Sequence, residues 1–166
     1  MLKKLILLLF IVAPVTIFAQ DKIAFINAGE IFSKMPELKD VETKLATKRE
    51  TITKQATAIQ TEYQTKLDQF SKDTTTVTQS ILLDRQSELE TLEKRYQDFI
   101  QNSQADFERE QQTLLAPLQQ KMRQAIKDVG DENNYTYILD AANLLHVGNN
   151  AIDASKQVKT KLGITD

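Results

Sequence analysis

Apolar residues recur at heptad-like spacing along most of this chain, from Leu38 to Leu114, a pattern typical of helices that pair through a narrow seam. The segment 37–129 contains no glycine and only one proline, so little in it opposes helix formation. A threonine-rich stretch, residues 73–80, interrupts the pattern, because such residues favour conformations other than helix. The pattern therefore predicts two long helices joined by a tip at 73–80.

The two predicted helices match as an antiparallel hairpin. Facing residues in such a hairpin have numbers with a constant sum, and seven apolar pairs give 151 or 152: Leu38 with Leu114, Leu45 with Phe107, Ile52 with Phe99, Ala56 with Tyr96, Ile59 with Leu92, Tyr63 with Leu89, and Phe70 with Leu82. Arg49 and Ser103 share the register and predict a polar layer midway. The resulting arm, residues 37–116, is about 55 to 60 Å long at about 1.5 Å per residue.

The proline inside the second helix falls at the end of this hairpin. Pro117 lies opposite Pro36 in the same register, where the first helix has not yet begun. An interior proline removes a helical hydrogen bond and favours a kink. We therefore predict that Pro36 and Pro117 form a hinge where the arm joins a compact base.

Short apolar runs near the two ends predict the strands of that base. Residues 22–27 fit a strand buried on both faces, residues 135–140 fit a second strand, and residues 144–147 fit a possible third. Two or three short strands leave sheet edges that need covering, and the base is small for an independent core. We predict a mostly α protein with a small β part, in which residues 20–36 and 117–166 form an α+β base that other subunits complete.

Helical segments complete the predicted base. Residues 28–35 fit one or two turns ended by Pro36, and the second long helix is expected to stop at Gly130, with a turn at 131–134. A terminal helix is expected in 148–163, with Asn150 as its N-cap and Gly163 beyond its end.

The first residues have the pattern of a cleavable signal peptide. Two lysines precede an apolar run that is too short to span a bilayer comfortably, and a small residue, Ala19, precedes Gln20. We expect cleavage after Ala19, so that residues 1–19 are removed and the chain is exported. No later segment is apolar enough for stable membrane insertion.

The composition argues against disulfide bonds and against nucleic-acid binding. The chain has no cysteine, so an exported protein must be stabilised by packing or oligomerisation and not by disulfides. Loss of Lys3 and Lys4 with the signal peptide leaves 19 basic and 23 acidic residues, a net charge of −4, which argues against nucleic-acid binding.

Nothing in the sequence indicates an enzyme or a cofactor site. No metal-ligand spacing and no glycine-rich phosphate loop is present, and the only histidine, His146, is expected to be a structural side chain near the base.

The two ends of the predicted mature chain resemble the Skp/OmpH family of periplasmic chaperones. The resemblance is strongest in KIAFINAGEIFSKMPELK and in LLAPLQQKMRQAIKDVGDENNYTYILDAAN, while the arm is similar in length and periodicity. It implies a periplasmic homotrimer that holds unfolded outer-membrane proteins, without ATP, in a cavity between helical arms. It also implies that six strand residues form the shared base: Ile23, Phe25, Ile26, Tyr137, Ile138 and Leu139.

The charge of the arm departs from the family pattern. Residues 37–116 carry 11 basic and 15 acidic residues, whereas the arms of well-known members are basic. We therefore transfer neither strong electrostatic capture of acidic clients nor lipopolysaccharide binding to this chain.

Client contacts are expected on apolar residues that lie off the seam, because seam residues are needed to hold the two helices together. The candidates are Leu67, Val77, Ile81, Leu83, Ile100 and Leu115. Two other functions stay open: a structural or docking coiled-coil protein of the envelope that binds a folded partner, and an adaptor that binds lipid or lipopolysaccharide.

Overall fold

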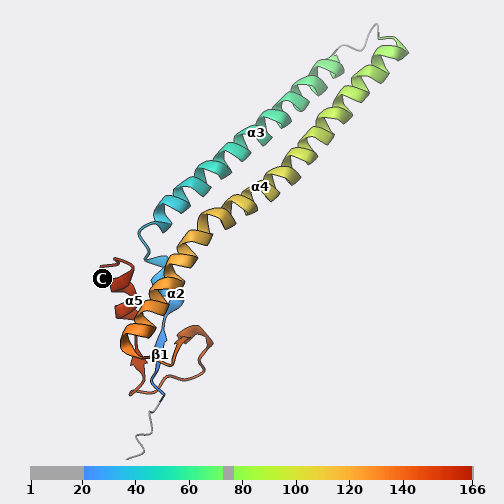
Figure 1. Ribbon diagram of the computed structural model, residues 1–166. Helices are drawn as coiled ribbons and strands as arrows, with labels where there is room; N and C mark the ends of the chain where they lie inside the picture. The colour runs from blue at the N-terminus through green and yellow to red at the C-terminus, as the bar shows by residue number, and fades with distance from the viewer. Residues whose placement is uncertain (1–20, 73–76, 166) are drawn as a thin grey trace, which may run out of the picture.

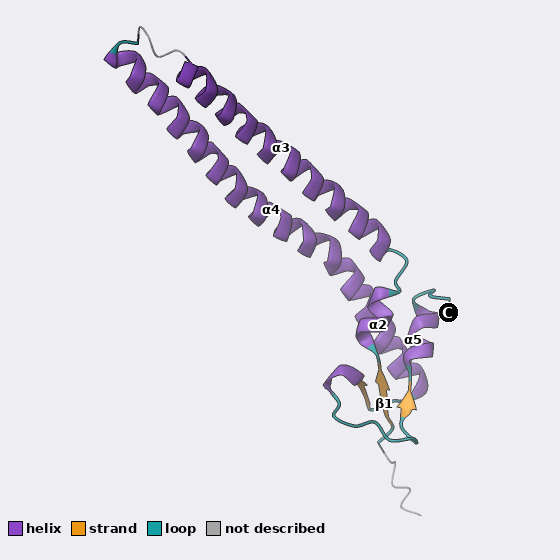
Figure 2. Cartoon of the chain, turned by 180° about the vertical axis from the view of Figure 1, so that it is seen from behind, coloured by secondary structure: helices purple, strands orange, loops and turns teal. Residues whose placement is uncertain are grey.

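The computed structural model describes residues 21–72 and 77–165, and shows a long helical hairpin standing on a small base (Figure 1). The elements in chain order are β1 (Ile23–Ile26), α2 (Ala28–Ser33), α3 (Leu38–Lys72), α4 (Gln79–Asn133), β2 (Tyr137–Asp140), the 3-10 helix η2 (Ala141–Asn143), β3 (Ile152–Asp153) and α5 (Ser155–Lys161). The predicted fold class is confirmed: α3 and α4 lie side by side along the arm, and the strands gather at its foot (Figure 2).

The base contains a three-stranded parallel sheet in the order β2-β1-β3. The strands predicted in 22–27 and 135–140 are confirmed as β1 and β2. The third strand predicted at 144–147 is wrong, because these residues lie in a loop and Ile152 pairs with Ala24 instead. An apolar run alone did not reveal which segment would reach the free edge of β1.

The hydrophobic core lies on one face of the sheet. Ala24 and Ile26 point into it from β1, and the fully buried side chains of Ile31, Val129 and Val158 join it from α2, α4 and α5. The prediction that β1 is buried on both faces is wrong for the single chain, since Ile23 is 48% exposed on the other face. Side chains alternate along a strand, so the second face is available to another molecule.

The seam of the arm follows the predicted register in its middle. Ile59 and Leu92, predicted to face one another, are both only 6% exposed and line the same groove between α3 and α4. Near the tip Phe70 and Leu82, also predicted to face one another, line a common pocket, although Leu82 is 49% exposed. At the predicted polar layer of Arg49 and Ser103, the Arg49 guanidinium stacks 5.3 Å from the centre of the Phe107 ring. The arginine therefore packs on an aromatic residue of the seam.

The helix α4 runs through Pro117 without a break and carries the chain from the arm into the base. Its partner α3 begins only at Leu38, so Pro117 does lie where the paired part of the hairpin ends. At this position an ion pair joins Glu37, in the turn just before α3, to Lys121 of α4. Lys121 lowers the pKa of Glu37, chiefly through their hydrogen bond. Motion at Pro36 and Pro117 stays a prediction.

Two predicted helix boundaries are wrong. The helix α4 continues past Gly130 to Asn133, and Asn134 takes the left-handed conformation (φ 55°) that ends it. The expected turn at 131–134 is therefore mostly helical. The terminal helix α5 starts after Ala154, not after Asn150, because the preceding residues Ile152 and Asp153 are held in β3. Gly163 lies beyond the end of the helix, as predicted, and has φ 72°.

The predicted signal peptide, residues 1–19, lies outside the described residues, as does part of the predicted tip at 73–76. Among the described helices, none combines the length and the apolar character needed to cross a membrane.

A double ion pair of Glu30 ties α2 to α5 and predicts an acid-sensitive contact. Glu30 Oε1 accepts from Lys34 Nζ and from Lys159 Nζ, both at 2.9 Å, and these lysines lower the pKa of Glu30 to about 2. A carboxylate with a lowered pKa stabilises the fold above its ordinary pKa of 4.5, and this contribution is lost as the pH falls through about 2. We expect Glu30→Gln to lower the urea midpoint of unfolding at neutral pH, and to have little effect near pH 2. An equal effect at both pH values would contradict this origin.

Candidate functional site

One face of the sheet is an exposed apolar surface. It is formed by Ile23 and Phe25 from β1 and by Tyr137 and Leu139 from β2, which the parallel register places side by side. Tyr137 is 58% exposed and Leu139 is 41% exposed. We call these four residues the apolar sheet face. Soluble monomers seldom leave such neighbouring apolar side chains uncovered.

The six predicted base residues therefore divide between two faces. Four form the apolar sheet face, whereas Ile26 is buried in the core and Ile138 packs against it. The sequence did not distinguish them, because both faces of β1 and β2 carry apolar residues and the strand pattern does not show which face the helices cover.

A loop beside the sheet adds further exposed apolar side chains. Leu145 is completely exposed, and Val147 is 38% exposed, in the segment that connects η2 to β3. His146 between them is exposed as well, and its expected role as a structural side chain near the base stays a prediction. Within the described residues no group of three or more His, Cys, Asp or Glu side chains is placed to hold a metal ion.

Four of the six candidate client residues are exposed along the arm: Leu67, Ile81, Leu83 and Ile100. Leu83 is the most exposed of them at 58%. Ile81 and Leu83 lie in the first turns of α4, and half-buried Val77 lies just before this helix. Leu115 differs from the others, because it is half-buried and packs against the core of the base.

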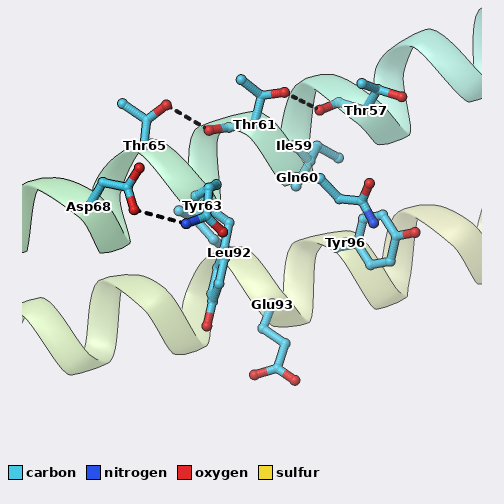
Figure 3. A pocket seen from close by; sticks show the side chains of 11 residues that line it. Thr57, Ile59, Gln60, Thr61, Tyr63, Thr65, Asp68, Leu92, Glu93 and Tyr96 are labelled. Carbon is cyan, nitrogen blue, oxygen red and sulfur yellow. Dashed lines mark hydrogen bonds between the residues drawn. The ribbon is translucent and has the colours of Figure 1, made fainter.

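An open groove of about 680 Å³ runs between α3 and α4 in the middle of the arm (Figure 3). Ile59 and Leu92 lie between the helices, and half-buried Tyr63 and Tyr96 come from α3 and α4. The remaining lining side chains are polar: Thr57, Gln60, Thr61, Gln64, Thr65, Asp68 and Glu93. Sequence reasoning placed both tyrosines in the seam and missed that they border a groove.

The negative charge of the predicted mature chain belongs to the arm. The base segments 20–36 and 117–166 hold eight basic and eight acidic residues, so the excess of four acidic residues lies in 37–116. Several charges pair across the hairpin, such as Lys48 with Glu110 at 3.0 Å and Arg95 with Glu62 at 3.1 Å. Exposed pairs of this kind contribute little stability but favour one register.

Comparisons with known proteins agree with this architecture. The family model described as Outer membrane protein (OmpH-like) matches residues 22–162. The chain is 26% identical over 144 residues to Chaperone protein Skp of Photorhabdus luminescens, covering 85% of this chain and 87% of that protein. It is 23% identical over 154 residues to Chaperone protein Skp of Pectobacterium atrosepticum, covering 91% and 93% of the two chains.

A solved structure shares the fold. A crystal structure described as an OmpH-like outer membrane chaperone from Caulobacter crescentus superimposes with a TM-score of 0.76 and 19% identity, over 87% of this chain and 85% of that chain.

Proposed function

The chain belongs to the OmpH-like outer membrane protein family, a family of chaperones and not of enzymes, and on this premise we propose that it is a periplasmic holdase for unfolded outer-membrane proteins. It acts without ATP and without a cofactor. Residues 1–19 direct its export, residues 20–36 and 117–166 form the base, and residues 37–116 form the arm that meets the client.

The apolar sheet face supports assembly into a homotrimer. Three copies of this small base bury the face of Tyr137 and Leu139 together and cover the short sheet edges. Burial of this apolar surface stabilises the assembly by about 25 cal/mol for each Å² removed from water. The arms, which project away from the base in Figure 1, then surround a common space.

The observation that carries the holdase proposal is the set of apolar side chains exposed along a long, otherwise charged arm. Leu67, Ile81, Leu83 and Ile100 each offer a weak contact with an unfolded chain. Several weak contacts at high effective concentration hold a client without fixing it. A bound client is withdrawn from aggregation and is still released when membrane insertion removes it.

A light-scattering experiment tests this function. A urea-unfolded outer-membrane barrel protein is diluted into buffer while the mature protein is titrated in. We expect aggregation to be suppressed without ATP, with saturation near one client per three chains, as for a trimer that encloses one client. No suppression at several-fold excess of folded, oligomeric protein would contradict the holdase function.

Substituting three of the candidate client residues is expected to weaken client binding. We expect Leu67→Ser, Leu83→Ser and Ile100→Ser together to weaken client binding by about ten- to hundredfold, because each removes an exposed apolar contact of about 0.5 to 1 kcal/mol. Substitution of Lys44, Gln55 and Gln97 by serine is the matched control, since these exposed arm residues are polar. Equal activity of both triple variants would exclude the three apolar residues as contacts.

A docking role for the arm is the alternative function. It is favoured by the ion pairs that fix the hairpin register, since a rigid spacer needs a defined register. Saturable binding to one folded envelope protein, with no effect on unfolded barrel proteins, would support it.

A further inference from the structure

The groove in the middle of the arm combines an apolar floor with acidic residues at its rim, and the proposed chaperone function does not assign a role to either. Resting on that function, we propose that this groove binds short unfolded segments in which an aromatic or aliphatic side chain lies next to a lysine or arginine. The groove is the one lined by Ile59, Tyr63, Leu92 and Tyr96, with Asp68 and Glu93 at its rim.

The floor of the groove selects an apolar side chain. Ile59 and Leu92 are each 6% exposed and close its bottom, while the rings of Tyr63 and Tyr96 remain half-exposed. In Figure 3, these four side chains lie where the two helices face each other. A volume of about 680 Å³ is large enough for one or two large side chains.

The charge of the rim selects the neighbouring residue. Asp68 and Glu93 line the groove, and no lysine or arginine lines it with them. Asp68 accepts a hydrogen bond from Gln64 Nε2 at 2.9 Å, and within the described residues neither carboxylate belongs to an ion pair. In Figure 3, Asp68 on α3 and Glu93 on α4 point in different directions, so a cation next to the apolar side chain of the ligand meets one carboxylate and not both. The net negative charge of the arm adds to the attraction.

Fluorescence anisotropy with three labelled, unstructured peptides tests this proposal on the full mature protein. The first peptide alternates phenylalanine and arginine, the second replaces arginine by glutamate, and the third replaces phenylalanine by serine. We expect the first peptide to bind about tenfold more tightly than either of the others, and added salt to weaken its binding. Equal affinity for the first two peptides would contradict the proposed preference for a basic residue. Equal affinity for the first and third peptides would contradict the proposed binding of an apolar side chain by the groove floor.

Paired variants locate the binding. Asp68→Asn with Glu93→Gln is expected to weaken binding of the phenylalanine–arginine peptide about three- to tenfold. The control, Asp84→Asn with Asp98→Asn, removes the same amount of charge outside the groove. We expect the control to weaken binding of this peptide less than the groove pair does. Equal losses in the groove and control pairs would overturn the location.

The same proteins separate this proposal from the holdase function. If the groove variants bind the peptides as the wild type does, while wild type suppresses barrel-protein aggregation, only the groove assignment fails. If wild type prefers the phenylalanine–arginine peptide but suppresses no aggregation, the holdase function fails and the groove remains a peptide site.

Discussion

Leu139→Asp is expected to convert the proposed trimer into monomers. Leu139 lies in the apolar sheet face, 41% exposed in the single chain, beside Phe25 of β1 in the parallel register. Burying a leucine side chain contributes about 1.5 to 3 kcal/mol, and a trimer contains three copies of the residue. The buried carboxylate adds an unpaired charge at each copy, which further opposes assembly. Sedimentation velocity at micromolar concentration measures the change.

A control variant and a functional assay complete this test. Lys156→Asp also places a carboxylate on the base, but on an exposed position of α5, and we expect it to sediment like wild type. Far-UV circular dichroism checks that Leu139→Asp keeps its helices. We expect this monomer to lose most of its suppression of aggregation, because separate arms enclose no common space. A folded Leu139→Asp protein that still sediments as a trimer would show that another surface joins the subunits.

Ile31→Ala is expected to cost about 2 to 5 kcal/mol of folding free energy, the typical range for removing a buried aliphatic side chain. Ile31 is 0% exposed and lies in the core that joins α2 to the sheet and to α4 and α5. Urea unfolding followed by circular dichroism measures the loss. Protein concentration must be held constant, because oligomerisation adds to apparent stability.

The matched control for this core variant is Leu83→Ala, near the end of the arm. Leu83 is 58% exposed, so its truncation is expected to change the folding free energy by less than about 0.5 kcal/mol. A cost at Leu83 as large as that at Ile31 would mean that the arm, and not the base core, limits stability.

The arm was predictable because its pattern is local and repeated. Each seam residue, such as Ile59 or Leu92, follows from heptad spacing, and one register relates many pairs at once. Near the tip the predicted partners Phe70 and Leu82 still line one pocket, but Leu82 is 49% exposed, which heptad spacing alone does not indicate. The interhelical groove was not predictable, since the exposure of Tyr63 and Tyr96 depends on how closely the two helices approach.

The sequence predicted a small base with two strands, but it did not predict the third strand. The strands β1 and β2 are short apolar runs with clear boundaries, whereas β3 consists only of Ile152 and Asp153 and has no periodic pattern to reveal it. The more apolar run at 144–147 remained a loop because it does not reach the free edge of β1. Strand pairing between residues more than a hundred positions apart depends on the whole chain path.

The sequence by itself determined that this protein is a long helical hairpin on a small mixed base, and its resemblance to chaperones of the Skp/OmpH family. Both rest on local periodicity and on short runs of residues at the two ends, which act over neighbouring turns. Only the tertiary structure decided which face of the sheet stays exposed, that α4 continues through Pro117, and where the arm opens into a groove. These features depend on contacts between distant segments, because burial is decided by what covers a surface and not by the residues that form it.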